Sequence, residues 1–145
     1  MVEIAFKLDP GKDEIDPIHQ GLIKFNREAI GRAAGWQPFA LNIIDDAGAK
    51  VGGLEGWTSH DWLFVGAFFV PESLRRQGLG RELMKRAETF ARERSCAGIW
   101  LDTFAFQAPG FYEKLGFTQL ASIEDHPRGS RRIFYMRRLE PSSTH

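Results

Sequence analysis

The most constraining feature of the sequence is a passage of strand, helix and strand between residues 62 and 106. The first strand, WLFVGAFFV (62 to 70), is apolar on both faces, as expected of a strand covered on two sides, and Pro71 closes it. Residues 79 to 94 place apolar side chains on one face of a helix and charged ones largely on the other. GIWLDTFAF (98 to 106) is a further strand. Because a connection of this length makes a right-handed crossover, the two strands are predicted to be parallel.

The chain before this passage predicts one strand, one helix and a hairpin. VEIAFKL (2 to 8) alternates apolar residues with others, which is typical of a half-buried edge strand. Asp16-Pro17 predicts the start of an amphipathic helix that ends at Gly31. PFALNIID (38 to 45) and KVGGLEGWTS (50 to 59) predict a hairpin, with the second strand loosened by its glycines.

The chain after the crossover predicts a short helix and a second hairpin. Residues 108 to 115 form the helix, which Gly116 stops as a C-cap. TQLASIE (118 to 124) and RRIFYMRRL (131 to 139) are the two strands of the hairpin. The predicted fold is therefore a mixed α/β single domain over residues 1–140, and residues 141–145 are predicted to be a frayed tail.

Composition excludes several function classes. The 19 basic and 19 acidic side chains give no net field to attract nucleic acid or an anionic membrane. The single cysteine, Cys96, forms no intramolecular disulfide or multi-cysteine metal site, which suits a reducing compartment, and it is interpreted as a small buried apolar residue. We find no signal peptide and no apolar segment near the ~20 residues of a membrane span, so we expect a cytoplasmic protein with no metal.

The turn into the long helix, RRQGLGRELMKR (75 to 86), is suited to phosphate. A helix N-terminus has unpaired N–H groups and a partial positive charge, and Gly78 and Gly80 leave room for close approach. Arg75, Arg76 and Arg81 add positive charge. A tight turn with solvated arginines is the alternative. The turn lacks the GK[ST] ending of a nucleotide-binding P-loop and does not fit the dinucleotide pattern.

A second feature lies in DTFAFQAPGFYEKLGF (102 to 117). Tyr112 is predicted on the short helix directly after the second parallel strand. Ligands of open α/β sheets lie beyond the carboxyl ends of such strands, so Tyr112 and the glycine turn are expected at one crevice. A packed aromatic residue with its hydroxyl at the surface is the alternative interpretation.

With these two motifs, the chain resembles the GNAT superfamily of acyl-CoA-dependent N-acetyltransferases. The resemblance rests on R-x-x-G-x-G at Arg75, Gly78 and Gly80 and on FYEKLGF at 111 to 117, and the order of elements agrees over nearly the whole chain. It implies a mostly antiparallel sheet of about six to seven strands, helices on both faces and central parallel strands splayed apart. It also implies acetyl-CoA as co-substrate and an acyltransferase activity.

The resemblance implies specific site residues. The coenzyme A pyrophosphate would lie on the amides of Gln77 to Arg81, and pantetheine would pair with the main chain of Phe68 to Val70. Tyr112 would be the general acid, since a hydroxyl of pKa ~10 can protonate a departing thiolate of thiol pKa ~8.5. Gln107 would replace a cofactor-contacting asparagine of the family, whose position here is Ala105. The full expected cofactor set is Phe68, Phe69, Val70, Arg75, Arg76, Gln77, Gly78, Leu79, Gly80, Arg81, Gln107, Phe111 and Tyr112.

The general base is less well defined. Many family members carry an acid in the strand that here is WLFVGAFFV, but this chain has Gly66 at about that position. Glu55, His60 and Asp61 are candidates, with Glu55 placed first, and solvent is a further alternative. For Glu55 the alternative role is a solvated strand residue.

The acceptor is not identified by the sequence. Residues expected around its cleft are Phe25, Trp36, Phe39, Trp57, His60 and Trp62, and the arginines at 128, 131, 132, 137 and 138 either bind an acidic acceptor or form a solvated face. The predicted function is transfer of an acetyl group to a primary amine of a small molecule or protein. The alternative is a coenzyme-A-binding sensor with little catalysis. A homodimer through the last strands is compatible with the sequence, although no feature requires one.

Overall fold

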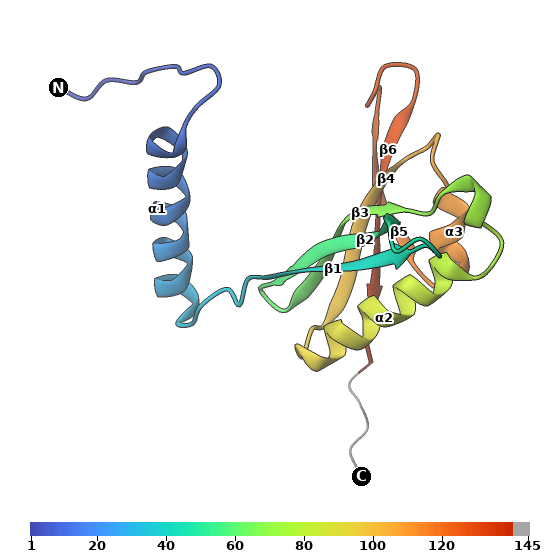
Figure 1. Cartoon of the computed structure of the whole chain (residues 1–145). Coiled ribbons are helices and arrows are strands. Elements are labelled where there is room, and N and C mark those ends of the chain that lie inside the picture. The colour runs from blue at the N-terminus through green and yellow to red at the C-terminus, as the bar shows by residue number, and fades with distance from the viewer. Residues whose placement is uncertain (141–145) are drawn as a thin grey trace, which may run out of the picture. The chain divides into compact units, whose positions relative to one another are not determined.

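The computed structural model describes residues 1–140, and these form two compact units, Met1–Ala34 and the residues from Gly35 onward (Figure 1). The first unit contains the helix α1, Lys12–Ile30. Its N-cap is Gly11, whose N–H donates to Glu14 Oε1 at 3.0 Å. It ends at Gly31, whose left-handed φ of 86° gives the predicted C-cap.

Two predictions about this unit are wrong. Residues 2–8 form no strand, and α1 begins at Lys12 rather than at Asp16-Pro17, which leaves Pro17 inside the helix. Alternation of apolar residues indicates that a segment is suited to a β-strand. A strand forms, however, only where a neighbouring strand hydrogen-bonds to its main-chain groups. The unit Met1–Ala34 contains no other strand to do so.

The second unit is built on a six-stranded sheet that matches the predicted mixed, mostly antiparallel sheet. Its strands are β1 (Gln37–Ile44), β2 (Lys50–Ser59), β3 (Trp62–Phe69), β4 (Gly98–Phe104), β5 (Thr118–Glu124) and β6 (Arg131–Arg138). Their spatial order is β1-β2-β3-β4-β6-β5, and every neighbouring pair is antiparallel except β3 and β4. The predicted parallel crossover and both hairpins are confirmed.

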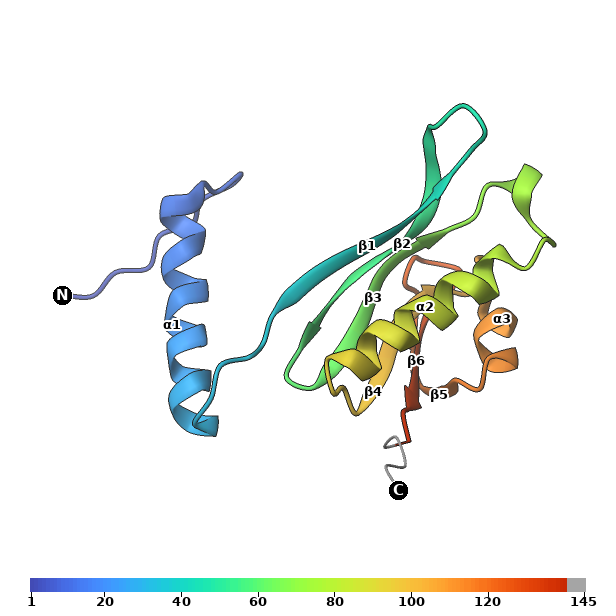
Figure 2. The ribbon, with the colours of Figure 1, turned by 60° about the horizontal axis from the view of Figure 1, so that its bottom comes forward.

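The helices α2 (Leu79–Glu93) and α3 (Pro109–Lys114) lie on the same face of this sheet, and a short 3-10 turn, Glu72–Leu74, precedes α2 (Figure 2). Alternate strand residues point to that face and are fully buried, among them Leu63, Ile99 and Tyr135. They pack with the buried side of α2, formed by Leu83, Met84, Ala87 and Ala91. The residues between them, including Trp57, Phe64 and Trp100, form the opposite face, which we call the aromatic face.

The parallel strands part before they end. Pairing of β3 with β4 runs from Trp62–Gly98 to Val65–Leu101. Beyond that point β3 stays paired with β2 as far as Phe69, but a bulge interrupts the register, because Gly56 pairs with Val65 and Glu55 with Ala67. Gly66 is the extra residue of this bulge. A bulge bends its strand, so it accounts for the divergence of β3 from β4.

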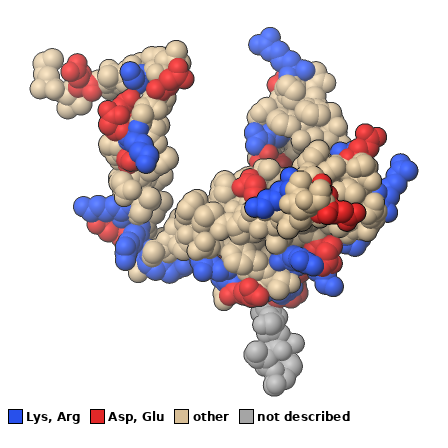
Figure 3. Space-filling model, in the orientation of Figure 1, with Lys and Arg blue, Asp and Glu red and all other residues tan. Residues whose placement is uncertain are grey.

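Charged side chains of both signs are interspersed over the visible surface, in keeping with the equal numbers of acidic and basic residues (Figure 3). No helix within residues 1–140 is long and apolar enough to cross a membrane.

Candidate active site

The glycine turn presents main-chain N–H groups at the start of α2. Arg76 and Gly78 both have left-handed φ values, 66° and 80°, which turn the chain sharply into the helix. Gly78 is the N-cap and supplies no side-chain cap, so the first helical N–H groups remain available to a ligand. A Cβ at Gly78 would meet no atom within 4 Å. The turn therefore combines a helix N-terminus with open space, the combination that phosphate groups require.

The two glycines of this turn serve different purposes. A Cβ at Gly80 would lie 3.2 Å from Cζ of Phe111 and 3.4 Å from Cζ of Phe68. Gly80 thus lets the first turn of α2 approach the Phe68–Phe111 pair, whose ring centroids are 5.6 Å apart. Gly78 leaves space on the solvent side of the turn.

The arginines of the turn are also divided in role. The Arg75 guanidinium donates through Nε to the Val70 carbonyl at 2.9 Å, which ties the turn to the end of β3. Arg76, Gln77 and Arg81 are exposed around the helix start. Leu79 is half-buried and anchors the first turn of α2 against the core.

The main chain of Phe68 to Val70 lies where β3 has parted from β4. These residues bond to β2 on one side, since Leu54 pairs with Phe68 and Gly53 with Phe69. Their other side faces the gap that opens beyond Val65–Leu101. Main-chain groups on that side can pair with an extended, amide-containing ligand in the manner of an added strand.

Tyr112 lies at the same end of the sheet, on α3. The residue is 8% exposed, and its ring contacts Phe68 edge-on at 6.2 Å between centroids and also contacts Phe111, Phe117 and Tyr135. Burial, with a smaller contribution from the charge of Asp102, raises the pKa of Tyr112 to about 12. The hydroxyl therefore keeps its proton at neutral pH and is available as a hydrogen-bond and proton donor.

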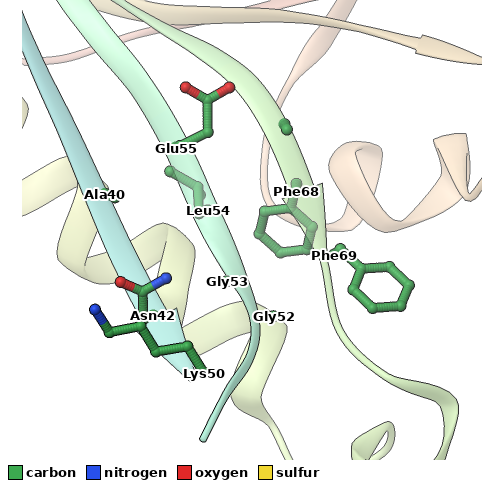
Figure 4. Close-up of a pocket in the computed structure, with 10 residues that line it drawn as sticks. Ala40, Asn42, Lys50, Gly52, Gly53, Leu54, Glu55, Phe68 and Phe69 are labelled. Carbon is green, nitrogen blue, oxygen red and sulfur yellow. The ribbon is translucent and has the colours of Figure 1, made fainter. Parts of the chain in front are cut away.

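Glu55 lies on the sheet face opposite α2 and α3. It borders a hollow of ≈ 270 Å³ lined by Ala40, Asn42, Lys50, Gly52, Gly53, Leu54, Glu55, Ala67, Phe68 and Phe69 (Figure 4). The Glu55 carboxylate occupies the space above Gly66, because a Cβ on Gly66 would overlap its Oε1 and lie 3.2 Å from its carboxyl carbon. The chain thus supplies an acid from β2 above Gly66, at about the position where many members of the resembled family carry an acid on this strand.

The other candidates for the base lie elsewhere. His60 and Asp61 form the turn between β2 and β3, with left-handed φ values of 49° and 69°. That turn is at the start of β3, whereas the strands part after Val65. Of the three candidates, only Glu55 lies beside the gap.

Several predicted side chains have structural partners. Gln107 Oε1 accepts hydrogen bonds from the Phe104 N–H and the Thr103 hydroxyl, both at 2.8 Å, so Gln107 fixes the end of β4. Arg132 pairs with Asp102 and Arg137 with Glu88. The Phe39 ring packs on Phe90 of α2, on the face away from Glu55.

Other parts of the expected acceptor cleft are on the aromatic face. The rings of Trp57 and Phe64 are tilted at 48° with 4.9 Å between centroids, and the Phe64 centroid lies 4.4 Å from that of Trp100. Sequence reasoning missed Phe64, Trp100 and Asp102, because their position depends on strand register.

Cys96 is buried as predicted, and burial raises the pKa of its thiol, with a smaller effect from Asp61. Within residues 1–140 no three His, Cys, Asp or Glu side chains gather as metal ligands.

Comparisons with known proteins identify the family of this chain. The model of the Acetyltransferase (GNAT) family matches residues 9–117. Blasticidin-S acetyltransferase of Streptomyces morookaense is 36% identical over 124 residues, which cover 85% of this chain and 89% of that protein.

Two crystal structures show the same fold. One, from Agrobacterium tumefaciens, has a TM-score of 0.85 at 30% identity and covers 96% of this chain and 100% of that one. The other, an acetyltransferase from Bacillus cereus, has a TM-score of 0.82 at 30% identity and covers 93% of this chain and 98% of that one. The chain belongs to the GNAT family of acetyltransferases, enzymes that use acetyl-CoA.

Proposed function

We propose that this enzyme, acting as one domain, transfers the acetyl group of acetyl-CoA to a primary amine by direct attack. The amine nitrogen forms a bond to the thioester carbonyl carbon, and the carbon–sulfur bond breaks. Glu55, through water, accepts the proton lost by the amine, and Tyr112 gives a proton to the departing thiolate. The attacking amine is the neutral form. The products are an amide and coenzyme A, and exchange with solvent then removes the proton from Glu55 and returns one to Tyr112, so atoms and charge balance over a full turnover.

The cofactor site of this proposal combines two groups of residues. The pyrophosphate lies on the amides of Gln77 to Arg81, and pantetheine pairs with the main chain of Phe68 to Val70. The open space at Gly78 and the unpaired edge of β3 support these roles. An N–H of the parted strand near Phe69 polarises the thioester carbonyl.

The observation that carries the mechanism is the arrangement of Tyr112 and Glu55 on opposite faces of the sheet. Tyr112 packs among Phe68 and Phe111 on the face that carries α2 and α3, while Glu55 lies above Gly66 on the other. Acetyl transfer through the gap between β3 and β4 requires a proton donor on the face where acetyl-CoA binds and a base on the face where the amine binds. Tyr112 and Glu55 lie on these two faces.

We propose a small molecule as the acceptor. The similarity to an acetyltransferase named for blasticidin S supports this class, because that protein is aligned over 85% of the chain. A protein amine is the second candidate. Thiol release from acetyl-CoA over a panel of small amines and N-terminal peptides separates the two.

The same assay tests the mechanism. Tyr112→Phe is expected to lower kcat by about 10²- to 10⁴-fold with little change in the Kd of acetyl-CoA. Tyr135→Phe is the matched control, because it removes the other tyrosine hydroxyl, which donates to Glu113 at 3.1 Å, and leaves Tyr112 in place. If wild type binds acetyl-CoA but no amine raises thiol release above background, the proposed acceptor class is wrong. Equal kcat for wild type and Tyr112→Phe would remove Tyr112 from the mechanism.

Two further expectations stay predictions. The edge strand β5 carries Leu120 and Ile123, 57% and 47% exposed, which supports a homodimer through the last strands. Light scattering of wild type and Leu120→Lys tests it, and a wild-type monomer at every concentration would contradict it. The second is a cytoplasmic location.

A further inference from the structure

An aromatic cluster at the end of β4 has no part in the mechanism above. The rings of Phe104 and Phe106 are stacked, with 5.2 Å between centroids and 5° between planes. The His126 ring meets Phe104 edge-on at 5.6 Å. We call Phe104, Phe106 and His126 the ring wall. It joins the end of β4 to the turn between β5 and β6, two segments that are distant in the sequence.

The ring wall is exposed but held in place. Phe106 is 65% exposed. The turn that carries it is fixed by hydrogen bonds from the Gln107 N–H to the Phe104 carbonyl and from the Ala105 N–H to the Arg131 carbonyl, both 2.9 Å. The hydrogen bonds accepted by Gln107 Oε1 add to this. An aromatic ring that is fixed and still open to solvent is preorganised for a ligand, since little conformational freedom remains to be lost on binding.

Strand register places the ring wall beside the gap. Leu101 and Thr103 are buried toward α2 and α3, so Asp102 and Phe104, which alternate with them, point to the aromatic face. Phe104 lies beyond Leu101, the last residue of β4 that pairs with β3. Glu55 lies on the same face on the other side of the gap, above Gly66 of β3. The base and the ring wall therefore border the gap from opposite sides.

The charge around the ring wall favours a neutral ring. The Arg132 guanidinium lies 5.6 Å from the Phe104 centroid and pairs with the Asp102 carboxylate at 2.6 Å. Its positive charge is thus already matched by a carboxylate. Phe106 offers a flat apolar surface, which prefers an aromatic partner because stacked and edge-on ring pairs are more favourable than the area they bury implies.

We propose, building on the proposed function, that the ring wall binds the planar ring of the acceptor and that the substrate is a small amine attached to an aromatic or heteroaromatic ring. The ring lies on Phe106, and the amine reaches across the gap toward Glu55 and the thioester. Phe106 is then a residue that determines specificity and takes no part in proton transfer.

Two amines that differ only in their ring test this proposal. Phenethylamine and 2-cyclohexylethylamine have the same linker and the same carbon count, but only the first has a planar ring. Thiol release gives KM and kcat for each, and ligand-observed NMR with coenzyme A present gives Kd without turnover. For wild type we expect KM and Kd to be roughly 2- to 12-fold lower for phenethylamine.

Variants at Phe106 test whether this residue causes the preference for phenethylamine over 2-cyclohexylethylamine. Phe106→Leu is expected to abolish it, so that the KM values of phenethylamine and 2-cyclohexylethylamine come within about twofold of each other, because leucine offers no flat ring to stack on. Phe106→Trp is expected to retain it. Ile44→Ala, another exposed apolar side chain but on β1, is the control and is expected to behave as wild type.

The two proposals fail separately. Turnover of amines without a ring preference, or a preference that survives Phe106→Leu, would overturn the ring wall and leave amine acetylation standing. Binding of phenethylamine that depends on Phe106, without thiol release from any amine of the panel, would overturn the proposed function and leave the ring wall standing. Absence of both binding and turnover for ring-bearing amines would overturn the ring wall, whatever other amines do.

Discussion

The carboxylate of Glu55 fills the space above Gly66 that a side chain on β3 would otherwise occupy. The two residues come from neighbouring antiparallel strands at the bulge, where Glu55 pairs with Ala67 and Gly66 has no partner on β2. Glycine at 66 is thus what lets an acid on β2 lie beside the gap. Under the proposed mechanism, the position of the carboxylate in space matters more than the strand that carries it.

This relationship predicts that the acid can be moved between strands. Glu55→Ala is expected to lower kcat/KM by about 10²- to 10⁴-fold, and the double variant Glu55→Ala/Gly66→Glu to recover at least tenfold of that loss. The single variant Gly66→Glu is expected to lose activity, since its Cβ overlaps the carboxylate of Glu55. Steady-state kinetics of the three variants are the measurement. A double variant no better than Glu55→Ala would show that more than the carboxylate's location matters.

The open space at Gly78 predicts where the cofactor binds, and Gly48 provides a matched control. Gly78 and Gly48 have φ of 80° and 83°, and a Cβ on either would meet no atom within 4 Å. Gly78→Asp places a carboxylate at the helix N-terminus and is expected to abolish binding of acetyl-CoA in calorimetric titration. Gly48→Asp, in the turn between β1 and β2, carries the same backbone strain and is expected to leave Kd within about twofold. Equal effects of the two variants would mean that strain alone explains the loss.

The raised pKa of Tyr112 predicts the alkaline behaviour of the enzyme. A general acid with a pKa of about 12 keeps its proton throughout the range in which amines become nucleophilic. We therefore expect kcat/KM to rise with pH and to show no decline up to about pH 10. A fall in kcat/KM centred below pH 9, measured while the protein remains folded, would contradict Tyr112 as the proton donor.

The raised pKa of Tyr112 also predicts how the free energy of unfolding depends on pH. Because the folded pKa of Tyr112 is higher than the unfolded value near ~10, its contribution is fully present below pH ~10 and is lost as the pH rises toward 12. Chemical unfolding of wild type and Tyr112→Phe at pH 8 and pH 11 tests this. The free energy of unfolding should fall further in wild type than in the variant, and identical losses would count against the shift.

The ion pair between Glu88 of α2 and Arg137 of β6 predicts a stability effect far from the active site. Burial disfavours the charged form of Glu88, but hydrogen bonds from Arg92 and Arg137 outweigh it and lower the pKa of Glu88 from its ordinary value of 4.5. Glu88→Gln is expected to cost about 1–3 kcal/mol of unfolding free energy at pH 7, a loss that diminishes as the pH falls below ~4.5. Glu82→Gln is the control, because Glu82 and Arg86 form an exposed pair on the same helix, worth about 0.3–0.5 kcal/mol. Equal losses in the two variants would contradict a special role for Glu88.

Sequence patterns predicted most of the second unit because its strands are set by local apolar periodicity and its helix ends by glycine. WLFVGAFFV and GIWLDTFAF formed the expected parallel pair, although β4 ends at Phe104 and the second half of β3 includes the exposed Phe69. The prediction of a strand at residues 2–8 was wrong because apolar periodicity does not show whether a neighbouring strand is there to pair with it. The position of Glu55 above Gly66 depends on a bulge, and the ring wall depends on a turn that brings His126 to Phe104. Neither leaves a periodic signal.

The divergence of β3 from β4 at Val65–Leu101 also bears on the order of events in turnover. If donor and acceptor occupy opposite faces of the sheet, each has its own route to solvent. Coenzyme A can then depart while the acetylated amine is still bound, and a fresh amine can enter before the next donor arrives. Initial-rate patterns in which both substrates must be bound together, without a compulsory order of addition, are the kinetic counterpart of a sheet that is open between two of its strands.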